Sequence, residues 1–452
     1  MSSLPFYVVT LAHGSAEAAL ACARALPEEA LPELRLDLLP GEDPEALVAA
    51  LGRRCLVCCR RRADGGAWEG DEAGRLERLR RALEGRPAWV DLEWELEPPA
   101  WMREARGRTR LLRSVHVAAG VRDLGQRLSS LPEGDAFKWV GVAERLADAA
   151  WVKPHLAWAR ERGLSLSAFL MGPKGLASRC LQRAWGGAFT YAAAEDAPPA
   201  APGQLPLGTL LAWRVHRLTP EYGLCGVLGS PALHSLGPAF HNARFQRAFK
   251  DLLYLPLDCG DAEEAAEALE ALPVLGASLT MPLKATLPAR LGLPGPLNTL
   301  WRRHPGAPWE HADTDAIALA AALDDLPRGP VLLLGSGGVA AASARALEAL
   351  RLPVLQASRR GPATPEAVQA FAPVGVVQAT ALGMEAEDPA PFPELLGAAR
   401  PSLRWAAEWV YRRDTAFAAW AEASGLRLVE GQKLFEGQAE EQSRRFTGGC
   451  GG

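Results

Sequence analysis

The sequence predicts an α/β fold in two parts. The first is an N-terminal (β/α)8 barrel of the TIM type, and the second is a two-subdomain α/β unit that contains a Rossmann dinucleotide-binding fold. Three observations predict this fold class. Short apolar runs alternate with amphipathic stretches up to about residue 212, a Pro/Ala-rich segment interrupts the pattern at 195–208, and an apolar run at 331–334 leads directly into a glycine-rich turn. A chain of 452 residues is long enough for two or three domains of about 150 residues each.

The predicted barrel rests on eight apolar runs, each followed by a stretch with helical periodicity. Two of the helical stretches, 71–85 and 144–163, place apolar residues at i, i+3 and i+4. Eight strands alternating with helices within about 210 residues favour a (β/α)8 barrel, in which chemistry occurs at the carboxyl ends of the strands. The strand candidates are 6–12, 33–39, 55–60, 88–95, 111–117, 136–142, 165–171 and 188–193.

A second pattern of strands and helices begins after the Pro/Ala-rich segment. Further strand candidates are 225–230, 252–258 and 275–281, and a break at 217–223 indicates a linker. We therefore expect one domain at 1–212 and a second region at 219–452.

The glycine-rich turn predicts a nucleotide site, because it lies between a strand and a helix. Glycines there permit a tight turn and leave helix N-terminal amides free for a pyrophosphate. The next strand, 352–358, ends in arginines, which suit a 2′-phosphate and favour NADP over NAD; a solvated arginine pair is the alternative. The expected cofactor-binding residues are Gly335, Ser336, Gly337, Gly338, Val339, Ala340, Ser358, Arg359 and Arg360.

Composition excludes several classes of protein. A net charge of −4 does not favour binding to nucleic acid or to a membrane surface. No apolar run reaches the roughly 18 residues of a membrane span, and the N-terminus does not resemble a signal peptide, so we expect a cytoplasmic protein with small-molecule substrates. Cys55, Cys58 and Cys59 cluster without a second ligand pair, so we expect free thiols and no metal site. The oligomeric state stays open.

Lysine is scarce, which makes individual lysines informative. The chain has six, and Lys138 lies in a strand-like run between Phe137 and Trp139. A desolvated lysine in a barrel is a candidate nucleophile for imine formation, since burial lowers its pKa. A strand-end lysine that reaches solvent is the alternative. His116 ends the preceding strand and is a candidate proton carrier, although an isolated histidine is more often structural.

The second half resembles the shikimate dehydrogenase family. The motifs that carry the resemblance occur in the family's order at 226–245, 279–284, 297–300, 313–316, 335–340, 379–384 and 431–438. The resemblance implies that Lys284 and Asp315 form the catalytic pair. It also implies a substrate subdomain at 219–314 plus 431–452, and an NADP-binding subdomain at 315–430. The implied substrate-binding residues are Ser235, Thr280, Asn298, Tyr411 and Gln438.

The first half resembles type I 3-dehydroquinate dehydratases, through motifs at 33–39, 60–66, 114–116, 137–143, 171–179 and 201–204. The resemblance implies that Lys138 forms an imine with the substrate ketone, that His116 moves protons, and that Arg179 binds the substrate carboxylate. The implied substrate-binding residues are Glu33, Arg35, Arg60, Asp64, Arg179 and Gln204.

Together the resemblances imply a bifunctional enzyme of the shikimate pathway that uses NADP. Some positions depart from the family patterns: Asp64 replaces Glu and Ala200 replaces Ser in the first half, and Gly237, Ser278 and Arg412-Arg413 are the departures in the second. Two alternatives therefore stay open. One is a quinate/shikimate dehydrogenase with a weakened lyase half, and the other is a ligand-binding homologue without turnover.

Overall fold

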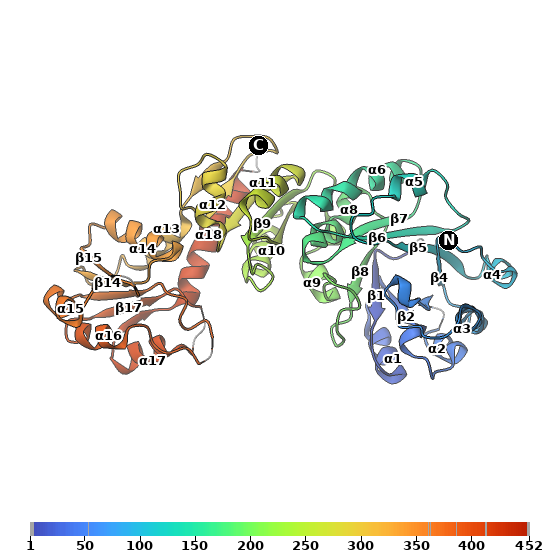
Figure 1. Ribbon diagram of the computed structural model, residues 1–452, viewed down its shortest axis with the longest axis horizontal. Coiled ribbons are helices and arrows are strands. Elements are labelled where there is room, and N and C mark those ends of the chain that lie inside the picture. The colour runs from blue at the N-terminus through green and yellow to red at the C-terminus, as the bar shows by residue number, and fades with distance from the viewer. Residues whose placement is uncertain are drawn as a thin grey trace. The chain divides into compact units, whose positions relative to one another are not determined.

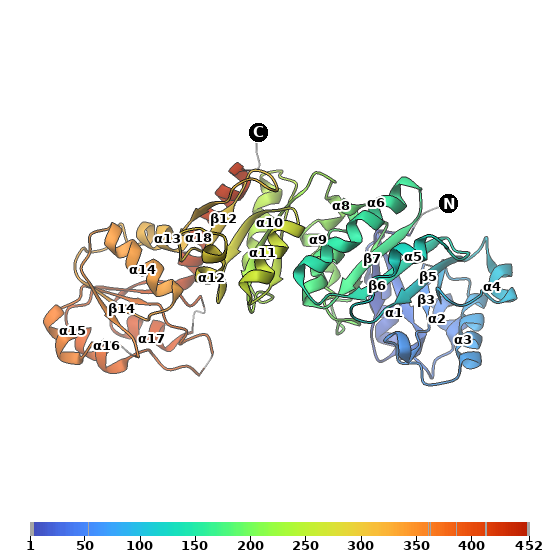
Figure 2. The same ribbon diagram turned by 45° about the horizontal axis from the view of Figure 1, so that its top comes forward.

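We describe a computed structural model of the chain, covering residues 4–449 except 53, 360, 362, 386, 412 and 413. The chain divides into two compact units. One consists of residues up to Leu224 together with 249–259 and 267–273, and the other consists of the rest. Each contains strands flanked by helices, as Figures 1 and 2 show. Among the described helices, none combines the length and the apolar character needed to cross a bilayer.

Eight strands form a nearly closed parallel barrel with the order β7-β6-β5-β4-β3-β2-β1-β8. The backbone amide of Ala188 donates to the carbonyl of Leu166 at 2.8 Å, which links the two ends of this order. The barrel predicted from the sequence is thus confirmed. The strands are β1 (Tyr7–Leu11), β2 (Ala30–Arg35), β3 (Leu56–Cys58), β4 (Trp89–Glu93), β5 (Arg110–His116), β6 (Ala136–Val142), β7 (Leu166–Met171) and β8 (Thr190–Ala193).

Helices lie on the outside of the barrel (Figure 1). They are α1 (Ala16–Ala25), α2 (Pro44–Ala50), α3 (Glu72–Glu84), α4 (Ala100–Ala105), α5 (Leu124–Leu128), α6 (Lys153–Glu161), α7 (Leu176–Cys180), α8 (Gln182–Trp185) and α9 (Leu207–Ala212).

Two predicted elements differ from the structure. The strand expected at 33–39 lies at Ala30–Arg35, and Leu36–Leu38 form a 3-10 turn instead. Arg35 donates to Asp37 two residues later, and this local pair closes the turn. The helix pattern at 144–163 is divided into a 3-10 segment, Leu146–Val152, and α6, because Pro154 occupies the first turn of α6 and its ring favours a helix start.

Side chains alternate between the two faces of each barrel strand, and this alternation positions the site. On β4, Trp89 packs in the interior cluster and Val90 packs against the helices, so Asp91 returns to the interior. On β6, Ala136 and Val140 are interior residues, which places Lys138 between them on the same face. The barrel interior is apolar near the amino ends of the strands, and polar side chains line it towards the carboxyl ends.

The second half contains two further five-stranded sheets. The first has the order β10-β9-β11-β12-β13, and the second is parallel with the order β15-β14-β16-β17-β18. The strands are β9 (Gly223–Gly229), β10 (Leu252–Asp258), β11 (Val274–Leu279), β12 (Thr299–Trp301), β13 (Glu310–Ala312), β14 (Val331–Leu334), β15 (Val354–Ala357), β16 (Gly375–Gln378), β17 (Trp405–Glu408) and β18 (Arg427–Val429).

The helices of this half include one that returns from the end of the chain. In Figure 2 the helix α18 lies beside β12, which is far from it in sequence, and it packs against α10 and α13. The helices are α10 (Gly237–Arg247), α11 (Ala262–Ala271), α12 (Leu283–Arg290), α13 (Thr314–Ala322), α14 (Gly338–Ala349), α15 (Pro365–Phe371), α16 (Pro393–Ala399), α17 (Ala416–Ala423) and α18 (Gly431–Gly449).

Candidate active sites

A cavity of about 340 Å³ opens at the carboxyl ends of the barrel strands. Seven of the eight residues predicted for this half line it: Arg35, Arg60, Asp64, His116, Lys138, Arg179 and Gln204. They come from different strands and from the loops that follow them, which is where a (β/α)8 barrel gathers its chemistry.

Lys138 is a buried lysine in the middle of β6, with a side chain 2% exposed. Its Nζ lies 3.6 Å from Oδ2 of Asp91 and 4.3 Å from the ring centre of Tyr191. Burial lowers the pKa of Lys138, and the Arg60 guanidinium lowers it further. A lowered pKa increases the fraction of neutral amine, which is the nucleophilic form.

His116 lies at the end of β5, on the strand hydrogen-bonded to β6. Burial lowers the pKa of His116 well below its ordinary value, and the cations Arg60 and Lys138 act in the same direction. The imidazole is therefore neutral near pH 7, which is the form that accepts a proton.

Arg179 supplies an anion-binding group to the cavity from α7. Its side chain is buried, and its contacts within the described part of the chain are the ring of Phe169 at 4.4 Å and the carbonyl of Pro202 at 3.5 Å from Nη2. Its Nε has no hydrogen-bond partner there. Burial lowers the pKa of Arg179 to about 10. A buried guanidinium without a carboxylate beside it is suited to bind one from a ligand.

A hydrogen-bond network supports the floor of the cavity. Thr10 Oγ1 donates to Glu33 Oε2 at 2.8 Å, and Gln204 Nε2 donates to Thr10 Oγ1 at 3.2 Å. Arg60 Nη2 lies 3.5 Å from Glu33 Oε1 and 3.6 Å from Asp91 Oδ2. Glu33 therefore contacts Arg60 directly and Gln204 through Thr10, and it is the predicted residue that is not part of the cavity lining.

Two other predicted residues are held by local ion pairs. Arg35 Nε donates to Asp37 Oδ1 at 2.9 Å. Asp64 Oδ2 accepts from Arg61 Nε at 2.6 Å. These pairs fix Arg35 and Asp64 at the cavity wall.

Glu33, Cys58 and Asp91 also form a compact group of metal-type ligands. Arg60 lies near both carboxylates, and Lys138 lies near that of Asp91. The Arg60 guanidinium, and Lys138 when it is protonated, disfavour the binding of a further cation at this cluster.

Sequence reasoning missed Thr10, Asp91, Phe169 and Tyr191. Strand alternation offers a signal for Asp91 and Tyr191, because each lies two residues from an interior aromatic residue, Trp89 and Phe189 respectively. Tyr191 also has a buried Oη without a hydrogen-bond partner among the described residues.

A second site lies in the other half, where Lys284 meets Asp315. Lys284 Nζ donates to Asp315 Oδ2 at 2.5 Å, between the first turn of α12 and the first turn of α13. A Cβ added at Gly338 would lie 3.3 Å from Cδ of Lys284. The glycine therefore lets the start of α14 approach the lysine closely, and this brings the glycine-rich turn next to the Lys–Asp pair.

Two predicted substrate residues are connected to this pair through Thr314. Asn298 Oδ1 accepts from the Thr314 backbone amide at 2.7 Å, and Gln438 Oε1 lies 3.5 Å from Thr314 Oγ1. Thr280 is three residues before the start of α12, and its carbonyl accepts from Leu283 at 2.8 Å.

Other predicted residues are not joined to the pair by a described contact. Ser235 accepts a hydrogen bond from the amide of Gly237 at 3.1 Å, within its own turn. Tyr411 is 44% exposed and packs against Phe435. Ser278, where the family has asparagine, donates to Gln442 at 2.8 Å, so its hydroxyl is engaged in the core of this subdomain. Arg412 and Arg413 lie outside the described residues.

The residues present fit a dinucleotide. Gly335 follows β14 with φ +126°, and a Cβ there would lie 2.5 Å from the carbonyl oxygen of Ala379. The helix α14 starts at Gly338, after an N-cap, Gly337, that makes no side-chain cap hydrogen bond. Its first amides are therefore available to a phosphate. Ser336 lies in the turn between β14 and α14, and Val339 and Ala340 lie at the start of α14. Ser358 and Arg359 follow β15, Arg359 is exposed, and Arg360 lies outside the described residues.

The two geometries define two classes of enzyme. A buried lysine of lowered pKa, beside a neutral histidine in a barrel cavity, is typical of enzymes that act through a lysine imine. A Lys–Asp pair beside a glycine-rich Rossmann turn is typical of a nicotinamide-dependent oxidoreductase.

Comparison with known proteins gives the families. Residues 7–213 match the family described as type I 3-dehydroquinase, and residues 227–291 match the shikimate dehydrogenase substrate binding domain. A protein of Arabidopsis thaliana named bifunctional 3-dehydroquinate dehydratase/shikimate dehydrogenase, chloroplastic, is 26% identical over 92% of this chain and 77% of its own length.

Two further relatives each match one half. The shikimate dehydrogenase (NADP(+)) of Rubrobacter xylanophilus is 32% identical over 52% of this chain and 94% of its own length. The 3-dehydroquinate dehydratase of Desulfotalea psychrophila is 30% identical over 39% of this chain and 83% of its own length. The chain belongs to the type I 3-dehydroquinate dehydratase family in its first half and to the shikimate dehydrogenase family in its second.

Proposed function

We propose that this chain catalyses two consecutive reactions, the dehydration of 3-dehydroquinate to 3-dehydroshikimate and the NADPH-dependent reduction of 3-dehydroshikimate to shikimate. The observation that carries the proposal is the single cavity shared by Lys138, His116 and Arg179. A nucleophile, a proton carrier and an unpaired cation are the three groups that an imine mechanism on an anionic ketone requires. Relatives named for both activities support the pairing, and neither the quinate nor the non-catalytic alternative is favoured.

In the first reaction, Arg179 binds the substrate carboxylate and Lys138 attacks the ketone. A carbon–nitrogen bond forms, water leaves, and the resulting imine withdraws electrons from the adjacent carbon. Neutral His116 then takes the proton from that carbon and returns a proton to the departing β-hydroxyl, which leaves as water. Hydrolysis of the imine releases the product and regenerates the amine of Lys138. Arg35, Arg60, Asp64 and Gln204 form the surrounding wall, and Glu33 holds Arg60 directly and Gln204 through Thr10.

In the second reaction, Lys284 gives a proton to the carbonyl oxygen that is being reduced. Asp315 holds the Lys284 ammonium at 2.5 Å and fixes its direction. NADPH supplies the hydride when it is bound. The chain's turn at 335–340 would hold its pyrophosphate, and Ser358, Arg359 and Arg360 would hold the 2′-phosphate. Ser235, Thr280, Asn298, Tyr411 and Gln438 are the proposed substrate contacts.

We also propose the domain limits 1–212 and 219–452, the second region comprising 219–314 plus 431–452 for substrate and 315–430 for NADP. The cytoplasmic location expected from the sequence stays a proposal, which fractionation of the source cells tests. The substrates proposed are small molecules.

The direct experiment supplies 3-dehydroquinate and NADPH to the full chain and follows NADPH oxidation and shikimate formation. We expect both. Lys138→Ala should stop turnover of 3-dehydroquinate and spare that of 3-dehydroshikimate, whereas Lys284→Ala should let 3-dehydroshikimate accumulate. The exposed lysines Lys153 and Lys433 provide matched controls, as Lys153→Ala and Lys433→Ala. No NADPH loss with either substrate, or a preference for quinate, would contradict the proposal.

A further inference from the structure

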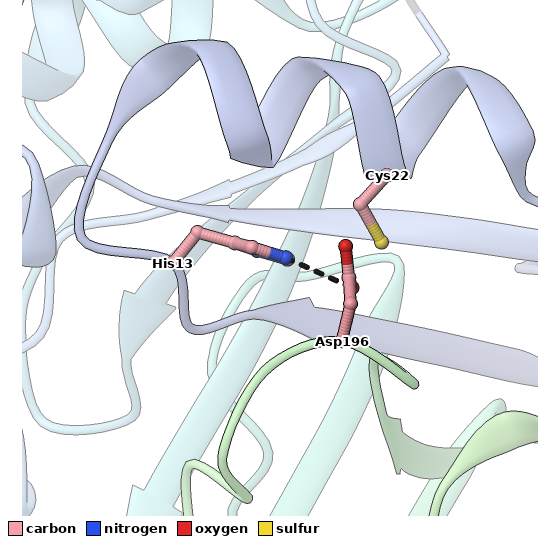
Figure 3. A group of neighbouring side chains, drawn as sticks. All are labelled: His13, Cys22 and Asp196. Carbon is pink, nitrogen blue, oxygen red and sulfur yellow. Dashed lines mark hydrogen bonds and ion pairs between the residues drawn. The ribbon is translucent and has the colours of Figure 1, made fainter.

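His13, Cys22 and Asp196 form a cluster of side chains that the dehydratase cavity does not include. One ligand-type atom from each lies within 4.8 Å of the other two, and His13 Nε2 is 3.0 Å from Asp196 Oδ1. Figure 3 shows the imidazole and the thiol both directed at the carboxylate. Three different donor atoms, nitrogen, sulfur and oxygen, therefore converge on one point.

The three residues come from separate parts of the barrel. His13 follows β1, Cys22 lies on α1, and Asp196 lies in the loop after β8. They are 9 and 174 residues apart in sequence, so no ligand spacing in the sequence reveals them. The expectation of no metal site rests on the spacing of Cys55, Cys58 and Cys59, which are not part of this cluster.

The arrangement does not suit a nucleophilic cysteine. In such a site the histidine contacts the thiol and removes its proton. Here Asp196 stands between the two, and His13 Nε2 donates to the carboxylate. Burial raises the pKa of Cys22 to about 11, and the Asp196 carboxylate adds to the effect. The thiol is therefore protonated in the absence of a cation.

A divalent transition metal would displace the proton of the Cys22 thiol, because cysteine binds a metal as the thiolate. Zinc binds cysteine, histidine and aspartate at about 2.0–2.3 Å, so adjacent ligand atoms of a tetrahedral site lie about 3.3–3.6 Å apart. The His13–Asp196 distance of 3.0 Å is already close to that value. The His13 side chain is 6% exposed and Asp196 is 61% exposed, so the site is anchored on one side and open to solvent on the other.

We propose that His13, Cys22 and Asp196 bind a divalent transition metal of the zinc class, with water as the fourth ligand. Binding replaces the thiol proton of Cys22, which passes to solvent, by a sulfur–metal bond. No bound metal is needed for the chemistry at Lys138, because the cluster is not part of that cavity lining.

A metal at this site would also hold the loop after β8 against the rest of the barrel. Asp196 precedes Ala200, Ala201, Pro202 and Gln204, and these four residues line the dehydratase cavity. A metal that joins Asp196 to His13 and Cys22 fixes the start of this loop to β1 and α1. Metal binding should therefore stabilise the dehydratase cavity and leave the dehydrogenase half unchanged.

Cobalt(II) is the probe, because a cysteine thiolate bound to cobalt gives a sulfur-to-metal charge-transfer absorption. The reduced full chain, freed of metal with a chelator, is titrated with Co²⁺, and Zn²⁺ is then added to displace it. We expect one Co²⁺ per chain with a thiolate band, and loss of the band in Cys22→Ala. Asp196 is exposed, so Asp196→Asn should fold normally. Loss of a group that only contacts a metal ligand weakens metal binding by about 10–100-fold, and loss of the Asp196 ligand itself should weaken it by at least as much.

Cys450→Ala is the matched cysteine control and should keep the band. A band that persists in Cys22→Ala, or no band in the wild type, would overturn the proposed site. For the loop, we expect Zn²⁺ to lengthen the half-life of dehydratase activity on heating in the wild type but not in Asp196→Asn. Equal half-lives with and without Zn²⁺ would overturn the stabilising role.

Discussion

The Nζ of Lys138 lies 3.6 Å from Oδ2 of Asp91, and the two residues come from strands separated by β5. Asp91 is buried, and neither of its carboxylate oxygens accepts a hydrogen bond within the described part of the chain. Its contacts are therefore electrostatic, with Lys138 and with Arg60. Burial and Arg60 lower the pKa of Lys138, and Asp91 opposes them. Asp91 thus raises the pH at which the amine becomes a nucleophile.

Asp91→Asn should move imine formation to lower pH. Without the carboxylate, burial and Arg60 act on Lys138 with less opposition, and its pKa should fall further. The measurement is the rate of borohydride-trapped adduct with 3-dehydroquinate as a function of pH. Glu104→Gln, an exposed carboxylate change on α4, is the control. A midpoint that stays in place or moves upward would show that Asp91 does not set the pKa of Lys138.

Ala200→Ser should strengthen substrate binding in the barrel. Ala200 lines the cavity, and its amide donates to Gln204 Oε1 at 3.1 Å, so a hydroxyl added there is held at the wall. One further hydrogen bond of about 0.5–1.5 kcal/mol corresponds to a KM lower by about 2–10-fold. Steady-state kinetics of the dehydratase reaction measure it, with Ala25→Ser on the exposed face of α1 as the control. An unchanged or higher KM would mean that the hydroxyl does not reach the substrate.

Arg359→Ser should reduce the preference for NADPH. Arg359 is exposed directly after β15, where a 2′-phosphate is expected. Loss of a charge-assisted contact of about 1.5–3 kcal/mol corresponds to a KM for NADPH raised by about tenfold or more. The KM for NADH should change little, because NADH lacks that phosphate. Arg303→Ser, an exposed arginine elsewhere in this half, should leave both values unchanged. Equal effects on both cofactors would argue against phosphate recognition by Arg359.

The fold followed from periodicity because burial repeats regularly along each element. The alternation of apolar residues predicted the eight barrel strands, and the strand–turn–helix pattern at 331–349 predicted the nucleotide fold. The strand at 33–39 was misplaced because Leu36 and Leu38 continue the apolar pattern, whereas the Arg35–Asp37 pair turns the chain. A specific side-chain contact of this kind leaves no trace in hydrophobic periodicity.

Some residues of the two sites could be predicted from the sequence and others could not, for a similar reason. Lys138 was visible because lysine is rare in this chain, and Lys284 because its motif is specific. Asp91 and Tyr191 reach Lys138 from strands that are distant in sequence, and a local pattern does not encode which strands face each other across a barrel. The His13–Cys22–Asp196 cluster was invisible for the same reason.

Glu408→Gln should stabilise the protein above neutral pH. Glu408 ends β17; its Oε2 accepts from Thr415 at 2.7 Å, and its Oε1 has no partner among the described residues. Burial raises the pKa of Glu408 to about 7. The folded state therefore binds the proton more tightly than the unfolded state, so stability is highest below the unfolded pKa and falls as pH rises towards 7. A shift of this size corresponds to at most about 3 kcal/mol.

Glutamine keeps the acceptor for Thr415 and carries no charge, so the gain in stability of Glu408→Gln should appear at pH 8 and vanish near pH 4. Chemical unfolding of both proteins at the two pH values measures it, with the exposed Glu394→Gln on α16 as the control. An equal gain at both pH values would assign the effect to packing and not to ionisation.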